Sequence, residues 1–406
     1  GDAVRRGALK QVAEGTAYVS LVDGPDLKNE GFDLQVERTG TRQYVTVRGG
    51  GPGGVMYGGL ELAEQIRLGG LEAVAATRRE PYIAMRGTKF NLPLDVRTPS
   101  YTDMGDSAQA NIATVWDFEF WREYLDHLAR DRYNYVSLWN LHPFPSLVKV
   151  PGYEDVALAD VQRSTGRFDE YYSTRTEDIV NPAMLAQVET VKKLTIDEKI
   201  AFWRRVMQYA KDRNIDCYIV TWNIYTYGTG GKHGITDAIT NPVTVDYFRK
   251  SVAQLFRTYP LLRGIGVTAG ENIGNANSSF QAKEDWLFAT YAQGVLDVAA
   301  GQPGRKIRFI HRQHETRAPD IARTFAPLTK NPDIDFVFSF KYAQAHVQSA
   351  TTQTFHRDFV ASLGDLKTLW TLRNDDALML RWAAPDFVRE FIGNMPREVT
   401  QGVYYG

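Results

Sequence analysis

The chain has 406 residues, of which 43% are hydrophobic and 23% are charged, and its formal net charge is −1. This composition is that of a globular protein with one large domain and a smaller one. A charge near zero gives no reason to expect nucleic acid or a membrane surface as a partner, and no window approaches the roughly 18 unbroken apolar residues of a spanning helix.

Residues 1 to about 80 are predicted to form a small α/β unit. Two alternating segments, FDLQVER and RQYVTVRG, flank a TGT turn and predict a β-hairpin. The glycine-rich GGGPGGVMYGGLELAEQIRL follows, and its apolar residues have helical spacing. A phosphate-binding loop is excluded because GK[ST] and a following βαβ unit are absent. We interpret these glycines as allowing close packing of a helix on the sheet.

Residues 81–406 repeat a short apolar strand followed by an amphipathic helix. Eight such strands predict an α/β fold, a (β/α)₈ TIM barrel preceded by the small α/β unit, with an open doubly wound sheet as the alternative. The chain ends on strand eight, so we expect a closing helix beyond Gly406. The predicted strands are Ala84–Phe90, Tyr133–Trp139, Asp216–Trp222, Gly264–Ala269, Lys306–Ile310, Asp335–Phe340, Lys367–Leu372 and Gly402–Tyr405.

The segments between these strands carry helix signals. After strand two comes an insertion over residues 141–194, and Thr195 with Glu198 forms a capping box that opens the next helix. The other predicted helices are Asp117–Arg130, Thr244–Arg257, Glu284–Ala299 and Pro385–Ile392.

Strand three carries the single cysteine, Cys217. It excludes an internal disulfide and a cysteine-built zinc site, and no histidine stands close to it as the base of a thiol nucleophile. One cysteine is compatible with a reduced cytosol and with a bacterial periplasm. Because the chain begins at Gly1 without a methionine or a signal-peptide pattern, we expect a trimmed or processed protein. The location that we expect is periplasmic or secreted, in a bacterium.

Carboxylates follow several strands at the end where barrel active sites lie. Strand four runs into AGEN, and burial of Glu271 beside apolar walls would raise its pKa, as a general acid requires. Hydrolysis of a glycosidic bond needs a second carboxylate. We expect Asp375 or Asp376 in that role, with Glu315 in reserve, although the two aspartates also fit a helix cap.

Basic, aromatic and amide side chains also follow the strands. Rings on loops suit the apolar faces of sugars, and loop packing explains them equally well. Several basic residues at one mouth predict an anionic sugar such as a uronic acid, unless they pair with the site's own acids. The predicted substrate-binding residues are Arg86, Lys89, Asn91, Asn140, His142, Trp222, Asn223, Tyr225, Asn272, His311, Arg312, His314, Lys341, Arg373 and Tyr404.

The HRQHE run, from His311 to Glu315, also has the composition of a metal site. The zinc-protease motif H-E-x-x-H lies on a helix, whereas this run follows a strand. Metal-dependent hydrolases with a barrel fold also have paired histidines on strand one, where this chain has Lys89 and Asn91. We therefore predict no metal and no cofactor, and keep a metal-dependent hydrolase centred on His311 and His314 as an alternative.

The small unit resembles the domain that precedes the barrel in glycoside hydrolases of families 20, 67 and 84. In those families a hairpin leads to a helix with the pattern G-x-x-Y-G-x-x-x-L-x-x-Q. AGEN with Glu271 resembles strand four of the α-glucuronidase family, and Asp375 falls where that family places a later carboxylate. The residues that match the helix pattern are Gly54, Tyr57, Gly58, Leu62 and Gln65.

The chain also departs from these families. Gly270 precedes Glu271, where family 20 has an Asp-Glu pair, so substrate-assisted cleavage of N-acetylhexosamines is disfavoured. The paired aspartates of family 84 are absent, and Lys341-Tyr342 stands where family 67 has an acid on strand six.

We therefore expect an exo-acting glycoside hydrolase, α-glucuronidase-like, that acts on oligo- or polysaccharides with an acidic sugar. A carbohydrate is the expected partner, and a homodimer is the candidate assembly. A non-catalytic carbohydrate-binding barrel is the second hypothesis. Carboxyl groups about 5 Å apart would indicate retention of configuration, and a separation of roughly 6.5 to 9.5 Å would indicate inversion.

Overall fold

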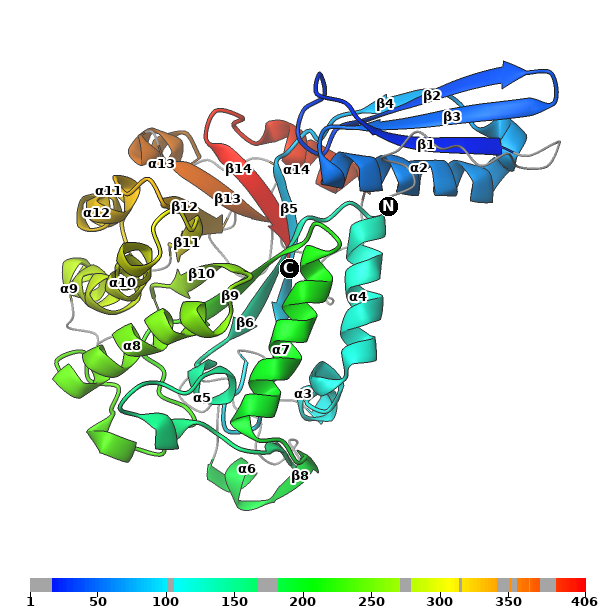
Figure 1. Cartoon of the computed structure of the whole chain (residues 1–406). Helices are drawn as coiled ribbons and strands as arrows, with labels where there is room; N and C mark the ends of the chain where they lie inside the picture. Colours follow the sequence, from blue (N-terminus) through cyan, green and yellow to red (C-terminus); the bar gives the residue numbers. More distant parts are fainter. Residues whose placement is uncertain are drawn as a thin grey trace. The chain divides into compact units, whose positions relative to one another are not determined.

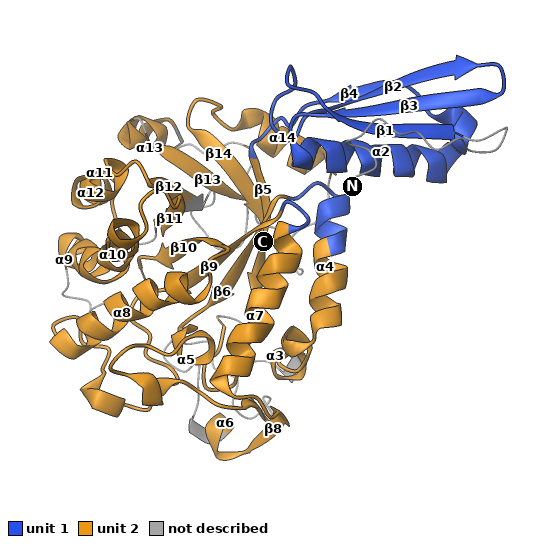
Figure 2. Cartoon of the chain, viewed as in Figure 1, with its two compact units in different colours: residues 1–84, 126–133, 212–214 blue, residues 85–125, 134–211, 215–406 orange. Residues whose placement is uncertain are grey.

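The computed structural model describes residues 17–100, 106–166, 182–270, 279–313, 316–341, 351, 356–364, 366–372 and 385–406. The chain forms two compact units (Figure 2). The smaller consists of Gly1–Ala84 with Asp126–Tyr133 and Asp212–Asn214, and the larger contains the rest. The predicted small unit of residues 1–80 thus corresponds to the first segment of the smaller unit, which also takes two short pieces from later in the chain.

The smaller unit contains a four-stranded sheet in the order β1 (Ala17–Asp23), β3 (Arg42–Gly49), β2 (Phe32–Thr39) and β4 (Thr77–Arg79). Strands β2 and β3 pair antiparallel, which confirms the predicted hairpin, and β1 runs parallel to β3. Helix α2 (Pro52–Gly69) packs on the sheet, and the short helix η1 (Leu71–Ala73) follows it. The core between helix and sheet consists of Phe32, Leu34, Val45, Val47, Tyr57, Leu62 and Val74.

Glycines let α2 approach the sheet closely, as predicted. A Cβ on Gly54 would lie 2.2 Å from the carbonyl oxygen of Gly31, and one on Gly58 would lie 2.5 Å from Cγ1 of Val47. Real Cβ atoms do not come this close to other heavy atoms. The two glycines of the helix pattern therefore have a packing role, which needs no phosphate to explain it.

The larger unit is a closed barrel of eight parallel strands surrounded by helices (Figure 1). This confirms the predicted (β/α)₈ fold and excludes the open sheet. Each of the eight strands overlaps the segment predicted from the sequence. In barrel order they are β5 (Met85–Asn91), β6 (Tyr135–Asn140), β9 (Asp216–Trp222), β10 (Leu262–Thr268), β11 (Ile307–Arg312), β12 (Ile334–Lys341), β13 (Lys367–Leu372) and β14 (Thr400–Tyr405).

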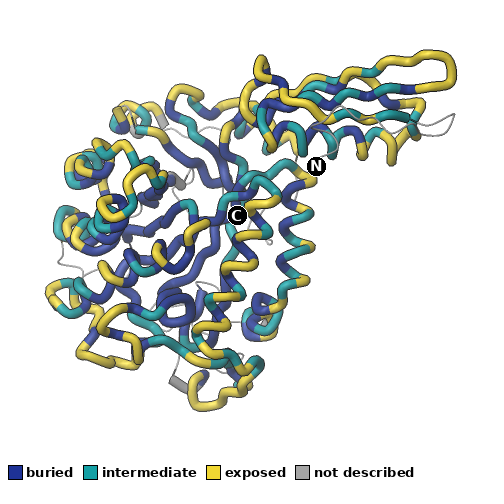
Figure 3. Tube along the Cα trace, viewed as in Figure 1, coloured by how far each residue is buried: buried dark blue, intermediate teal, exposed yellow. Residues whose placement is uncertain are grey.

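The helices around the barrel carry both buried and exposed residues along their length, as the colours of Figure 3 show. The capping box is confirmed, since the backbone N–H of Glu198 donates to Oγ1 of Thr195 at 3.2 Å and the N–H of Thr195 donates to the Glu198 carboxylate at 2.7 Å. The helices that follow strands are α4 (Phe118–Arg130), α7 (Ile196–Lys211), α8 (Pro242–Thr258), α9 (Phe280–Leu287), α10 (Gln293–Gly301), α11 (Ala318–Thr324), α12 (Ala326–Thr329), α13 (His356–Leu363) and α14 (Pro385–Asn394).

The predicted helix Glu284–Ala299 is interrupted. A π-helical turn, η7 (Phe288–Ala292), joins α9 to α10. Shorter elements lie in the loops, and those of the long insertion include an antiparallel pair of strands. They are α3 (Asp106–Asn111), η2 (Thr114–Trp116), α5 (Phe144–Leu147), η3 (Glu154–Val156), β7 (Val161–Ser164), α6 (Pro182–Ala186), β8 (Val188–Lys192) and η6 (Lys232–Gly234).

Alternate residues of each strand fill the barrel, because side chains along a strand point to opposite faces in turn. Near the amino ends of the strands, Arg308 donates from Nη1 to the hydroxyl of Tyr218 at 2.9 Å and from Nε to Asp335 at 2.7 Å. Gly266 leaves room for Val220 and Ile310, which a Cβ would meet at 3.0 and 3.3 Å. The inside of the barrel is therefore a packed core, and a ligand has to bind at an end.

Candidate functional site

Three aromatic rings lie together inside the barrel toward the carboxyl ends of the strands. The ring of Trp139 on β6 lies 5.4 Å from that of Trp222 on β9 and 6.0 Å from that of Tyr404 on β14. Their polar atoms are held in place, since Trp139 Nε1 donates to Ser137 Oγ at 2.9 Å and the hydroxyl of Tyr404 lies 2.9 Å from Ser339 Oγ. These contacts hold the three rings in place toward the carboxyl end of the barrel interior, and we call Trp139, Trp222 and Tyr404 the aromatic floor.

Two cationic side chains lie against the same indole. Nζ of Lys89, on β5, is 5.1 Å from the centre of the Trp139 ring, and the guanidinium carbon of Arg312, on β11, is 5.2 Å from it. Both distances are within the range of cation–π attraction. Two strands on different sides of Trp139 thus bring positive charge to one place, and we take this cluster as the candidate site.

Among the described residues, the buried guanidinium of Arg312 is only partly hydrogen-bonded. Its side chain is 7% exposed, and Nη1 donates to Thr268 Oγ1 at 3.3 Å. Its Nε–H has no hydrogen-bond partner within the part of the chain that the structure describes. A buried guanidinium with a donor left over suits a carboxylate, which accepts two parallel hydrogen bonds from it.

Asn140 is predicted to bind substrate, but its polar atoms are engaged by the backbone. Nδ2 donates to the carbonyl oxygens of Leu92 and Thr98 at 2.9 and 2.8 Å, and Oδ1 accepts from the N–H of His142 at 2.9 Å. The side chain has no exposed surface. We therefore remove Asn140 from the candidate site and describe it as a clamp on the loop after β5.

His142 is also buried, away from the aromatic floor. Its Nδ1 lies 2.5 Å from the carbonyl oxygen of Tyr227, and its ring packs against Phe144, Tyr247 and Phe248. Burial lowers the pKa of His142 to about 4, so the imidazole is neutral at pH 7. Because a carbonyl only accepts, Nδ1 carries the proton. A neutral imidazole enclosed by rings is a core residue, and we do not count it as a ligand.

Asn223 likewise faces the backbone. Its Nδ2 donates to the carbonyl oxygens of Thr268 and Ala269, each at 3.3 Å, and to that of Gly270. The side chain is completely buried. The amide therefore binds the backbone at the end of β10. We do not place it among the groups that touch substrate.

The side chain of His311 points out of the barrel. On β11 the interior positions are Arg308, Ile310 and Arg312. His311 lies between two of these positions and therefore faces the helices. Nε2 of His311 lies 2.8 Å from Oε2 of Glu284 on α9, and both side chains are completely buried. His311 is thus separated from the mouth by the wall of the barrel, contrary to the sequence-based expectation.

Arg86 lies at the amino end of β5, opposite to the end where barrel sites form. Met85 and Gly87 face the interior on either side of it, so its side chain faces outward. Asn91 and Lys341 are the last residues of β5 and β12, at the expected end, although the side chain of Lys341 lies outside the described part of the structure.

Tyr225, 4% exposed, stacks on Tyr227 with ring centres 5.4 Å apart, beside the aromatic floor.

All four predicted catalytic carboxylates lie outside the described residues. In the sequence, Glu271 directly follows Gly270, and Arg373 directly follows Leu372, the last residue of β13. The predicted site residues beyond the described part are Glu271, Asn272, His314, Glu315, Arg373, Asp375 and Asp376.

Within the described ranges, no three His, Cys, Asp or Glu side chains are close enough together to hold a metal ion. Burial raises the pKa of Cys217 to about 12, which leaves its thiol protonated and unreactive. No helix in the described ranges is long and apolar enough to cross a membrane.

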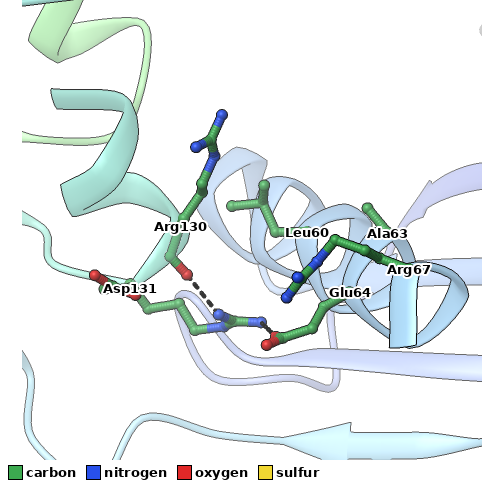
Figure 4. A pocket seen from close by; sticks show the side chains of 7 residues that line it. Leu60, Ala63, Glu64, Arg67, Arg130 and Asp131 are labelled. Carbon is green, nitrogen blue, oxygen red and sulfur yellow. Dashed lines mark hydrogen bonds and ion pairs between the residues drawn. The ribbon is translucent and has the colours of Figure 1, made fainter. Parts of the chain in front are cut away.

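A separate pocket of about 610 Å³ lies on the smaller unit (Figure 4). Its charges largely cancel, because Arg132 lies 3.8 Å from the carboxylate of Glu64 and 3.1 Å from that of Glu61. This pocket has none of the aromatic floor of the barrel mouth, so we do not place the active site there. The lining residues are Leu60, Ala63, Glu64, Arg67, Arg130, Asp131 and Arg132.

Trp139, the centre of the candidate site, is absent from the residues predicted to bind substrate. A signal for it exists in the sequence. Tyr135 is an interior residue, and a period of two along β6 carries the interior face through Ser137 to Trp139. A buried strand such as YVSLWN (Tyr135–Asn140) is apolar on both faces, however, so the period can be read only once one interior residue is known.

Comparison with solved structures places this fold among known ones. A "GH138 enzyme targeting pectin rhamnogalacturonan II" superposes with a TM-score of 0.68 at 22% identity, covering 99% of this chain and 43% of that one. A GH20 β-N-acetylhexosaminidase from Streptomyces coelicolor gives 0.57 at 14% identity, covering 96% and 73%. A β-hexosaminidase from Streptomyces plicatus gives 0.55 at 13% identity, covering 96% and 72%.

The chain has the fold of these enzymes. This confirms, at the level of the fold, the expected resemblance to glycoside hydrolases with a small α/β domain before the barrel. The chain spans less than half the length of the GH138 enzyme. No protein-family model and no curated protein matches the sequence.

Proposed function

We propose that the protein is an exo-acting glycoside hydrolase, α-glucuronidase-like, that cleaves the glycosidic bond of an acidic sugar. The observation that carries the proposal is the pair of cations, Lys89 and Arg312, on the Trp139 ring at the carboxyl end of the barrel. The fold it shares with the GH138 and GH20 enzymes supports glycosidase chemistry, and the pectin that the GH138 enzyme targets agrees with a polysaccharide substrate.

In this proposal the aromatic floor receives the apolar face of the sugar. Arg312 and Lys89 bind its carboxylate, and the Nε–H of Arg312, which has no partner among the described residues, supplies one of the hydrogen bonds. Two charges in a water-poor site are worth more than the same charges on the surface. A neutral sugar would offer the guanidinium only hydroxyl acceptors in place of a carboxylate, and the stronger charge-assisted bond gives the site its preference for an acid.

The chemistry belongs to carboxylates on the loops after β10 and β13. Glu271, which directly follows Gly270, is the proposed general acid that protonates the leaving oxygen. Asp375 or Asp376, a few residues after Leu372, is the proposed base or nucleophile. Strands β11 and β12 stand between β10 and β13 in the barrel, so the two acids would approach the bond from separate sides of the mouth.

The proposal is tested by sugar release from a panel of aryl glycosides and uronic-acid oligosaccharides, with the wild type and Glu271→Gln. We expect cleavage of a uronide by the wild type and loss of at least about 100-fold in kcat by the variant, the size typical of general acid–base catalysis. Equal cleavage by both would remove Glu271 from the mechanism. Binding of sugars without cleavage of any would instead favour the carbohydrate-binding barrel.

A periplasmic or secreted location belongs to the same proposal, because a polysaccharide of this kind is met outside the cytoplasm. Detection of the native protein in the periplasmic or extracellular fraction would support it. Exclusive recovery from the cytosol would contradict it.

A further inference from the structure

The carboxamide of Asn223 has only one possible orientation. Its Oδ1 lies 2.5 Å from the backbone N–H of Ile224, and its Nδ2 faces the carbonyl oxygens of Thr268, Ala269 and Gly270. An N–H can only donate and a carbonyl can only accept, so exchanging the two amide atoms would break every one of these bonds. The side chain is therefore a directed donor toward the end of β10.

The backbone at Asn223 is hydrogen-bonded to a side chain from the surrounding helices. The hydroxyl of Tyr291 lies 2.9 Å from the carbonyl oxygen of Trp222 and 2.8 Å from that of Asn223. Tyr291 belongs to the π-helical turn η7, and it has no exposed surface. The extra residue of a π turn shifts the side chains that follow, and such turns are frequent at functional sites. Here the turn presents Tyr291 to the end of β9.

The hydrogen bond from Asn223 to Gly270 lies just beyond the last backbone pair between β10 and β11. The last ladder pair of β10 with β11 is Thr268 with Arg312, and one further bond joins the N–H of Ala269 to the carbonyl of Arg312 at 3.2 Å. The next carbonyl, that of Gly270, accepts a hydrogen bond from Nδ2 of Asn223. A carbonyl shares a rigid peptide plane with the N–H of the next residue. Directing this carbonyl therefore orients the peptide group with which the described part of this segment ends at Gly270.

We propose that Asn223 is a positioning residue for Glu271, and that Tyr291 supports it; the inference rests on the proposed function, in which Glu271 is the general acid. Asn223 does not touch the sugar. It sets the direction in which the chain leaves β10, and so the place from which the acid reaches the leaving oxygen. A displacement of about 1 Å in such a group costs about 100-fold in rate.

Asn223→Asp tests this role, because it keeps the shape and removes the donor. An ionised carboxylate only accepts, so it would repel the three carbonyls, whereas a protonated carboxyl has one O–H to donate. At pH 7 we expect kcat to fall by about 10- to 100-fold with KM within about twofold. As the pH is lowered, kcat of the variant relative to that of the wild type should rise, since protonation returns one donor.

Asn140→Asp is the matched control. Asn140 makes the same kind of clamp, with Nδ2 on the carbonyls of Leu92 and Thr98 and Oδ1 on a backbone N–H, but at the loop after β5. It should lower the melting temperature about as much as Asn223→Asp does, with a much smaller change in kcat and no recovery at acid pH. Equal falls in kcat for both variants, without recovery, would overturn the positioning role.

Two further measurements separate the possible failures. If Asn223→Asp does not fold, Tyr291→Phe removes only the supporting hydroxyl, and we expect a fall in kcat of severalfold with KM unchanged; an unchanged kcat would overturn the proposal. Glu271→Gln is measured in parallel. A fully active Glu271→Gln enzyme would overturn the general acid and the positioning role with it. An inactive one beside a fully active Asn223→Asp enzyme would overturn the positioning role alone.

Discussion

Nε2 of His311 lies 2.8 Å from Oε2 of Glu284, and neither side chain has any exposed surface. The pair joins β11 to helix α9 across the outer side of the barrel wall. Phe325, Phe336 and Phe338 surround the imidazole, so water cannot replace either partner. A pair of this kind is costly to break from one side only, because the remaining polar group stays buried.

Glu284→Leu should therefore lower the free energy of unfolding by about 3 kcal/mol. His311→Leu should cost a similar amount, and the double variant should be more stable than the sum of the two changes predicts, by about 1 kcal/mol or more. Urea-induced unfolding of the four proteins gives this coupling. Strictly additive effects would mean that the two side chains do not depend on each other.

The buried imidazole of His142 predicts a pH dependence of stability. Burial lowers its pKa to about 4, below the ordinary value of 6.5 that it regains on unfolding. Between these two values the unfolded chain binds the extra proton, so the free energy of unfolding rises with pH from 4 to 6.5, by up to about 3 kcal/mol. This stability is complete above pH 6.5 and is lost as the pH falls toward 4.

His142→Gln keeps a donor for the carbonyl of Tyr227 but cannot take up this proton. The slope of unfolding free energy against pH should therefore be smaller by about one proton between pH 4 and 6.5. His127→Gln, at an exposed position on α4, is the control and should leave the slope unchanged. An unchanged slope in His142→Gln would contradict the burial of a neutral imidazole.

Two adjacent glycines of α2 should respond to alanine in opposite ways. A Cβ on Gly58 would meet Val47 at 2.5 Å, whereas one on Gly59 would meet nothing within 4 Å. Gly58→Ala should destabilise the protein by about 1–3 kcal/mol through overpacking. Gly59→Ala should stabilise it by about 0.5–1 kcal/mol, because alanine loses less entropy in a helix. Melting temperatures that move in the same direction would show that the helix does not lie this close to the sheet.

Arg312 should determine how strongly the enzyme prefers an acidic sugar over a neutral one, measured as the ratio of the two kcat/KM values. In Arg312→Gln we expect kcat/KM for an aryl uronide to fall by about 10- to 100-fold, the loss of a charged hydrogen bond. The same ratio for the corresponding neutral hexoside should change much less, because that substrate has no carboxylate. Lys306→Gln removes one charge near the amino end of the same strand, on an exposed side chain, and serves as the control. Equal losses on both substrates would show that Arg312 has a structural role.

The periodicity of the chain was enough to predict the fold. Alternating residues from Phe32 to Gly49 specify the hairpin, and helical spacing specifies α2 and α4. Eight apolar runs separated by helices leave few arrangements other than a closed parallel barrel. The interruption by η7 was not predictable, because a π turn keeps the composition of the helix around it.

The direction of each side chain was harder to predict. Barrel strands are buried on both faces, so they lack the alternation that separates interior from exterior. His311 and Arg312 are neighbours with similar chemistry, yet one faces the helices and the other the aromatic floor. Asn140 and Asn223 raise a different difficulty, because an amide that binds a sugar and an amide that binds a carbonyl have the same sequence signature.

Trp139 lies in contact with two cations and two other rings, and this gives the barrel mouth an optical signal of its own. Indole emission depends on nearby charge, so a ligand that draws Lys89 and Arg312 toward its carboxylate changes the fluorescence of Trp139. Among the other tryptophans, Trp121, Trp203 and Trp370 are completely enclosed in the protein and add a constant background. Binding of an uncleaved sugar acid could thus be titrated by fluorescence, without a label and without turnover.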